Sequence, residues 1–331
     1  MPAADNRDDQ GYLNRLPSDR LPREVVGDIF SKAKDESLLL SLGREIPVSV
    51  NENVVWADDT YPEAGQVGGT TLASREGGVK PIQGIQFATP KVFSPIKLAV
   101  IVTVSEEFAR TNPDRLYSNL APKLAGAIGR AADLAAFHNK DAILGTDLVG
   151  TTNNSFVNAT TNRVELDLSQ GANPDAVAQL LAGVSMVEDD EDGNYEVTAF
   201  AARPSVRTKL ATLRDANGNP VFQGAYPGSG AEINLRAGMN SLFGLPVAYS
   251  RTVRGKVGAV EDQGVLMFAG DFSQLAWGFA DDIRIKVSDQ ATVGGVSMWQ
   301  TNQIAVLAEA TFGWIVNDPN AFVAYDVPTG S

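Results

Sequence analysis

Cysteine is absent from the 331 residues, so disulfide bonds, thiolate metal sites, iron–sulfur clusters and cysteine nucleophiles are all excluded. No run of about eighteen apolar residues occurs, which argues against a membrane-spanning helix. The polar, acidic start MPAADNRDDQGYLNRLPSD lacks the apolar stretch of a signal peptide. Basic residues number 27 against 40 acidic ones, and the net charge of −13 disfavours nucleic-acid binding as the main task.

Histidine occurs once, as His138 in LAAFHNKDA. A Ser-His-Asp triad needs an oriented histidine beside a nucleophile, and no GxSxG turn is present. A single histidine without cysteine also disfavours a zinc site, and the glycine clusters fit neither GxGxxG nor GxxxxGK[ST]. The sequence therefore predicts no catalytic residue, no cofactor and no metal, and it predicts that His138 lies on a helix surface.

The acidic run EDDEDGNYE partly matches a calcium-binding loop. Glu188, Asp190 and Asp192 precede Gly193 at a suitable spacing, but Ala199 stands where the loop needs its bidentate glutamate. A solvated acidic turn is the favoured interpretation.

The amino-acid composition is that of a globular protein, with 44% hydrophobic and 20% charged residues. Strand-like runs at 46–57 and 85–105 flank a Gly-rich segment with little apolar periodicity. A loop of that length is uncommon inside a compact domain, and an isolated hairpin is marginal in water. We therefore predict a two-stranded arm that projects from the body and packs against another chain.

Two helices are predicted in the first half of the chain. Apolar residues at helical spacing run through residues 21–42 and end at Gly43. A longer pattern begins at Pro113, where Asn-Pro-Asp supplies a cap, a first-position proline and an acid in the first turn, and it continues to about Leu144. Roughly 30 residues would give a rod of about 45 Å, which Pro122 should kink or divide.

The second half predicts an αβ lobe followed by long strands. Helices are expected from Asp175 and over residues 204–213, with strands in YEVTAFAARP, FGLPVAYSRTV and GVLMFAGDF. GDFSQLAWGFADDIRIKVSDQA predicts two short strands around a turn. In residues 304–316, by contrast, every second residue is apolar, which predicts a single strand of about 43 Å. Such a strand is longer than usual.

This order of elements resembles the major capsid proteins of tailed bacteriophages, which have the Hong Kong 97-type fold. VTVSEEFARTNPDRL is similar to the entry into that family's spine helix, and FGLPVAYSRTV to the strand after its Leu-Gly-Pro-type turn. NQIAVLAEATFGWIVNDPNAFV resembles its closing strands, including an Asp-Pro-x-Ala-Phe ending. The resemblance covers nearly the whole chain.

The resemblance implies an α+β fold with an N-arm, an extended hairpin loop, a peripheral lobe with a long spine helix and an axial αβ lobe. The implied parts are an N-terminal arm (1–45), an extended hairpin (46–100), a peripheral domain with the spine helix (101–170), an axial domain (171–280) and closing strands of the peripheral domain (281–331).

The function implied is structural: self-assembly into pentamers and hexamers of an icosahedral head, in the virion, that encloses double-stranded DNA without sequence-specific binding. The implied partners are copies of the same chain, with separate scaffold, portal and decoration proteins as further candidates, and no membrane. Two alternatives remain open. One is an encapsulin-like bacterial compartment that holds protein cargo, and the other is an extracellular glycan-binding or adhesin protein.

Six charged residues are predicted to lie at subunit contacts: Arg75, Lys80, Glu106, Glu107, Arg284 and Lys286. Exposed ion pairs are usually weak, so solubility is the competing explanation for the two hairpin residues Arg75 and Lys80. Some family members crosslink a hairpin lysine to an asparagine of an adjacent subunit. Lys80 with Asn317 or Asn320 would be the formal candidates, but position alone does not support a crosslink, and none is predicted.

Overall fold

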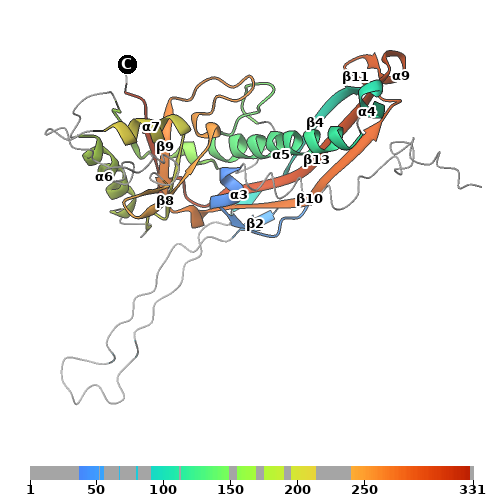
Figure 1. Ribbon diagram of the computed structural model, residues 1–331. Helices are drawn as coiled ribbons and strands as arrows, with labels where there is room; N and C mark the ends of the chain where they lie inside the picture. Colours follow the sequence, from blue (N-terminus) through green and yellow to red (C-terminus); the bar gives the residue numbers. More distant parts are fainter. Residues whose placement is uncertain are drawn as a thin grey trace, which may run out of the picture.

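A computed structural model describes residues 37–51, 53–55, 91–111, 113–148, 155–168, 175–189, 195–213 and 240–328, together with residues 67 and 80. The described chain forms an elongated lobe and a compact lobe, joined end to end (Figure 1). The elongated lobe has a four-stranded sheet and one long helix, and the compact lobe has a six-stranded sheet and two helices. In this part of the chain, no helix is long and apolar enough to cross a membrane.

The sheet of the elongated lobe is built from very long strands. Its order is β1 (Arg44–Glu45), β10 (Leu275–Ser288), β13 (Gln303–Val316) and β4 (Ile96–Ser105). Strand β13 is antiparallel to both β10 and β4, and β1 runs parallel to β10. The long strand predicted at 304–316 is therefore confirmed, and it lies in the middle of the sheet.

The prediction of two short strands around a turn in GDFSQLAWGFADDIRIKVSDQA is wrong. Strand β10 is continuous for 14 residues, and the polar Ala-Asp-Asp segment is a bulge between Phe279 and Arg284 rather than a turn. A bulge keeps both halves paired to the same neighbour while it disturbs the local alternation of side chains. The predicted boundary between residues 280 and 281 falls inside this strand.

The long helix α5 (Pro113–His138) follows the short helix α4 (Glu106–Thr111). Its 26 residues extend about 39 Å, and it ends at His138 rather than at Leu144 because Asn139 adopts a left-handed conformation with φ of 53°. Pro122 lies inside the helix and does not divide it. Leu120 and Leu124 are buried in the main core, and such tertiary packing outweighs one missing backbone hydrogen bond.

The main core lies between α5 and one face of the long sheet. Because strand side chains alternate, every second residue of β13 points toward the helix. These buried residues are Ile304, Val306, Ala308, Ala310, Phe312, Trp314 and Val316. The same core continues under the compact lobe, so the two lobes are packed together rather than tethered by a linker.

The compact lobe is a mixed sheet with helices on one face. Its strand order is β5 (Arg163–Glu165), β14 (Phe322–Asp326), β9 (Val265–Gly270), β6 (Ala199–Ala202), β8 (Leu245–Tyr249) and β7 (Ser241–Leu242). Helices α6 (Asp175–Glu188) and α7 (Pro204–Thr212) confirm the two helices predicted for this lobe. In β6, Phe200 faces these helices, whereas Ala201 faces the main core.

The base of the predicted hairpin is visible as a short antiparallel pair. The run predicted at 85–105 is divided at residues 94 and 95 into β3 (Lys91–Phe93) and β4, and β2 (Asn53–Val55) pairs with β3. The Gly-rich segment between them lies outside the described residues except for residues 67 and 80, and so does most of the helix predicted over 21–42. Within the described residues a short helix, α3 (Leu38–Leu42), begins after the extended residue Ser37, so the predicted helix does not run unbroken to residue 42, although it stops at Gly43 as predicted.

Candidate assembly surfaces

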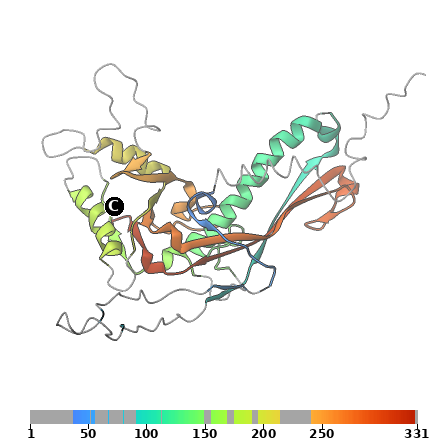
Figure 2. The same cartoon turned by 90° about the horizontal axis from the view of Figure 1, so that it is seen from below.

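The long sheet has one face that no helix of the described chain covers. Its near end, beside the compact lobe, is covered by Phe93 together with Ile46 and Val48. Along its far half the outward residues of β4 are exposed, and Ile101 has 50% of its surface accessible. Figure 2 shows this part of the sheet extending well away from the compact lobe.

The open face carries a small ladder of charges. The Glu309 carboxylate lies 3.0 Å from Lys97 Nζ and 3.3 Å from Lys286 Nζ, which joins three strands. These two hydrogen bonds hold the pKa of Glu309 below its usual range. Arg284 pairs with Asp281 at 3.0 Å across the bulge. The predicted contact residues Arg284 and Lys286 are thus both on the open face, and each already has an acidic partner in its own chain.

The other predicted contact residues occupy different places. Glu106 and Glu107 form the first turn of α4, at the far end of the sheet, where Glu106 N donates to Asn302 O at 2.9 Å. Lys80 is exposed, and Arg75 lies outside the described residues. The structure therefore brings four of the six predicted residues to the far part of the elongated lobe.

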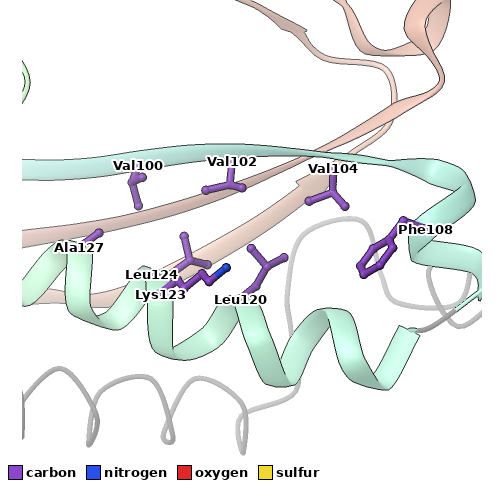
Figure 3. Close-up of a pocket in the computed structure, with 8 residues that line it drawn as sticks. All are labelled: Val100, Val102, Val104, Phe108, Leu120, Lys123, Leu124 and Ala127. Carbon is purple, nitrogen blue, oxygen red and sulfur yellow. The ribbon is translucent and has the colours of Figure 1, made fainter.

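An apolar groove lies along the outer edge of this lobe, between β4 and α5 (Figure 3). Its volume is about 340 Å³, and Lys123 is the one charged residue among the described residues that line it. The apolar lining consists of Val100, Val102, Val104, Phe108, Leu120, Leu124 and Ala127. Phe108 is 47% exposed at the mouth. Strand β4 is the last strand in its sheet, and such edges are usually covered in stable proteins.

The far end finishes in a small tip made of β11 (Thr292–Val293), β12 (Val296–Ser297) and α9 (Met298–Thr301). Gly294 and Gly295 have φ of 59° and 82°, which suits the two-residue turn between the paired strands. Met298 is buried and anchors the tip, whereas Trp299 is 77% exposed. A rigid exposed tryptophan is the type of side chain that dominates protein–protein contacts.

A buried carboxylate ties the described start of the chain to both lobes. Asp133 of α5 accepts hydrogen bonds from Ser37 Oγ at 2.6 Å, Leu38 N at 3.2 Å, Leu39 N at 3.0 Å and Thr252 Oγ1 at 2.7 Å. Helix α3 is therefore capped by a residue of another helix, while Thr252 belongs to η5 (Arg251–Arg254) of the compact lobe. Burial raises the pKa of Asp133, and the four hydrogen bonds oppose that effect.

His138 lies on the same helix and is buried, so its predicted place on a helix surface is wrong. Its Nε2 lies 3.0 Å from Val253 O, which fixes this nitrogen as the donor, and its buried Nδ1 has no hydrogen-bond partner among the described residues. Burial, followed by the charges of Arg163 and Lys140, lowers the pKa of His138 to about 4. The residue is neutral at pH 7 and is a structural side chain.

Asp133, Trp299 and the groove were not predicted from the sequence. A signal for Asp133 existed, because this acid stands alone among small apolar residues in GRAADLAAFH. Trp299 has no such signal, since nothing in the sequence separates an exposed tryptophan from a buried one. The groove depends on the distance between β4 and α5, which only the tertiary structure fixes.

The fold and these surfaces define a class of protein. The chain is an elongated structural subunit with apolar groups exposed at its edge and tip, and its long strands form a stiff support for them. Such a combination is expected of a subunit whose edge and tip are covered by other proteins.

Comparison with known proteins identifies the family. The sequence profile of the Phage capsid family matches residues 19–327, so the chain belongs to that family. A probable major capsid protein of Mycobacterium phage D29 is 29% identical over 315 residues, which cover 92% of this chain and 89% of the relative.

Solved structures show the same fold. A chain of Gordonia phage Cozz has a TM-score of 0.71 at 29% identity and covers 89% of this chain and 87% of that one. A chain of Mycobacterium phage Ogopogo has a TM-score of 0.68 at 25% identity, over 88% of this chain and 92% of that one. The predicted Hong Kong 97-type fold is confirmed, and the chain is a major capsid protein, a structural component of the virion shell.

Proposed function

We propose that copies of this chain assemble into pentamers and hexamers, which form an icosahedral head around double-stranded DNA. The observation that carries this proposal is the far end of the elongated lobe, where Trp299, Phe108 and Ile101 are exposed on a rigid support. Aromatic side chains such as Trp299 and Phe108 are enriched where proteins contact each other. Many weak contacts of this kind act together in a closed shell.

We assign the elongated lobe to the predicted peripheral domain and the compact lobe to the predicted axial domain. In this assignment the N-terminal arm (1–45) and the extended hairpin (46–100) reach neighbouring subunits. Burial of Leu38, Leu39 and Leu40 beside Asp133 supports a fixed origin for the arm. The pairing of β2 with β3 supports a fixed origin for the hairpin.

The charged residues predicted at subunit contacts keep that role in the proposal. Arg284 and Lys286 lie on the open face, where a neighbouring hairpin can cover them, and Glu106 and Glu107 lie beside the tip. Ion pairs between these exposed residues and a neighbouring subunit are expected to be weak. We therefore expect them to align the two subunits rather than to strengthen the contact. The chain has no catalytic activity in this proposal, and scaffold, portal and decoration proteins are separate partners.

The first experiment is expression of the full chain alone, followed by negative-stain electron microscopy of the soluble fraction. Closed polyhedral shells, or rings of five and six subunits, are the expected result. If the chain stays monomeric alone, the neighbouring phage genes are co-expressed to supply a scaffold. Monomers under both conditions would overturn the proposal. DNA inside the shells would identify a phage head, whereas a co-purifying enzyme would identify the encapsulin-like compartment.

A further inference from the structure

The turn that follows α5 displays two large aliphatic side chains, Ile143 and Leu144, which we call the apolar knob. They are 76% and 69% exposed, more than any other aliphatic side chain among the described residues. Small and polar residues usually form turns, and here Asp141 and Gly145 do so. Asp141 Oδ1 accepts hydrogen bonds from Ile143 N at 2.7 Å and Leu144 N at 3.0 Å, and Gly145 has φ of 73°. The turn itself therefore does not need aliphatic side chains at its apex.

The apolar knob stands on a rigid base. Lys140 Nζ lies 2.6 Å from Asp147 Oδ1 across the base of the turn. Ala259 N donates to Ala142 O at 3.0 Å, and a Cβ on Gly258 would lie 2.0 Å from the same oxygen, so the two backbones are in close contact. A surface that is already ordered loses little conformational freedom when it binds. The knob is thus prepared for contact with another molecule.

The groove between β4 and α5 has the complementary character. Its lining is apolar, Val102 and Leu124 lie between the strand and the helix in Figure 3, and the exposed Lys123 is its one charged residue within the described chain. The apolar knob is flanked by two acids, Asp141 and Asp147, and the Asp147 side chain is 72% exposed. Apolar surface and opposite charge therefore match between the groove and the knob.

The groove and the knob cannot meet within one chain. Ala127, at the near end of the groove, and His138 are 11 residues apart on α5, which is about 17 Å along the helix, and the knob is held beyond His138 against Ala259. A knob that fills a groove must therefore belong to another copy. A ring of identical subunits needs two different, complementary patches on each copy, because its contacts are head to tail.

We propose that the apolar knob of one copy inserts into the groove between β4 and α5 of the next copy in the same ring. In this contact Lys123 faces the acids that flank the knob, which favours one orientation of the two copies. The inference rests on the proposed function, since it requires that the chain forms rings.

Cysteine pairs test the contact directly, because the chain has no cysteine of its own. Variant V102C/L144C places one thiol in the groove and one on the knob, and air oxidation with copper phenanthroline links thiols only where they lie close together. Oxidised rings or shells are expected to give a covalent ladder of up to five and six chains on a denaturing gel. T103C/L144C is the matched control, because Thr103 is exposed and points to the opposite face of β4. It should give no ladder.

A second pair of variants tests whether the knob is needed. I143S/L144S removes most of its apolar surface and is expected to lower the yield of rings or shells by about tenfold or more, since central apolar contacts dominate many interfaces. I143L/L144I keeps that surface and should assemble like the unchanged chain. Both side chains are exposed, so the thermal midpoint of each unassembled variant should equal that of the unchanged chain.

The results also separate the other occupants of the groove. If the unchanged chain assembles but V102C/L144C shells form no ladder, or one that stops at two or three chains, the inference is overturned and the proposed function stands. In that case, loss of V102C reactivity toward a maleimide on assembly would show that another segment or protein fills the groove. Normal assembly of I143S/L144S would also overturn the inference. If the unchanged chain forms no ring with or without a scaffold, the proposed function falls with it.

Discussion

At the scale of single residues, Asp133 is the one buried carboxylate among the described residues. Its side chain is fully buried. Within the described residues it accepts hydrogen bonds from two backbone amides and two hydroxyl groups, and from no cation. The four donors stabilise an ionised carboxylate at this buried position. The carboxylate therefore holds α3, α5 and η5 in one arrangement.

Replacing Asp133 with asparagine should loosen this arrangement. The amide keeps one acceptor oxygen but turns an NH₂ group toward donors, so we expect a loss of about 2–4 kcal/mol in the free energy of unfolding. Urea unfolding of the unassembled chain measures the loss, and hydrogen exchange should accelerate at the amides of Leu38 and Leu39. T252V, which removes one donor, should cost only about 1 kcal/mol. An unchanged midpoint in D133N would contradict this account.

His138 should make stability depend on pH. Its pKa is about 4 in the folded chain, against 6.5 for a histidine in an unfolded chain, so the unfolded chain binds the proton more tightly. The stability that it contributes is complete above pH 6.5 and is lost as the pH falls toward 4, with a total of about 3 kcal/mol.

H138Q is the matched variant, because its side-chain NH₂ can still donate to Val253 O and does not titrate. Urea midpoints between pH 7 and about 4.5 should fall more steeply for the unchanged chain than for H138Q. Asp133 acts in the opposite direction, since its raised pKa favours the protonated folded state at low pH, but it is present in both proteins and cancels. Parallel pH curves would show that His138 is not the titrating group.

At the scale of elements, a pair of glycines lets another segment lie on the long sheet. Gly278 and Gly313 face each other across β10 and β13. A Cβ on Gly278 would lie 2.2 Å from Ile46 O and 2.6 Å from Val48 Cγ2. The missing side chains thus make room for residues 46–48, and Ile46 N donates to Trp277 O at 2.8 Å.

G278A should therefore push this segment off the sheet. We expect a loss of about 1–3 kcal/mol from overpacking, measured by thermal or urea unfolding of the unassembled chain. G313A is the graded control, because its Cβ would meet Phe93 at 3.0 Å and Val48 at 3.1 Å, contacts that side-chain movement can relieve. Equal effects of the two substitutions would argue against a rigid backbone contact at Gly278.

Local patterns predicted the elements whose faces differ in polarity. Strand β13 was predictable because apolar residues occupy every second position over its whole length, and α5 because its cap and apolar stripe are clear. The bulge in β10 looked like a turn because two adjacent acids interrupt the alternation, and only the neighbouring strand shows that pairing continues. The environment of Asp133 was not predictable, since its partners lie 94 to 119 residues away in sequence.

At the scale of the whole molecule, the far end of the elongated lobe carries four exposed apolar side chains, Ile101, Phe108, Val296 and Trp299, while others lie on the compact lobe. Replacing Trp299 with alanine should leave the stability of the unassembled chain within about 0.5 kcal/mol, because the side chain is 77% exposed. Assembly should nevertheless be slower and less complete, as measured by light scattering and electron microscopy. W299F keeps the aromatic ring and should retain most of the assembly. If W299A assembles normally, the tip is not a subunit contact.

The order of strands in the long sheet has a consequence for synthesis. Strand β13 lies between β10 and β4, yet it follows both of them in the chain. Until β13 is synthesised, β4 has no partner strand and the main core lacks its central layer, because contacts between distant parts of a chain form late. The elongated lobe therefore cannot be completed before β13 has been synthesised. A nascent chain that still lacks β13 cannot present the finished elongated lobe to a neighbouring subunit.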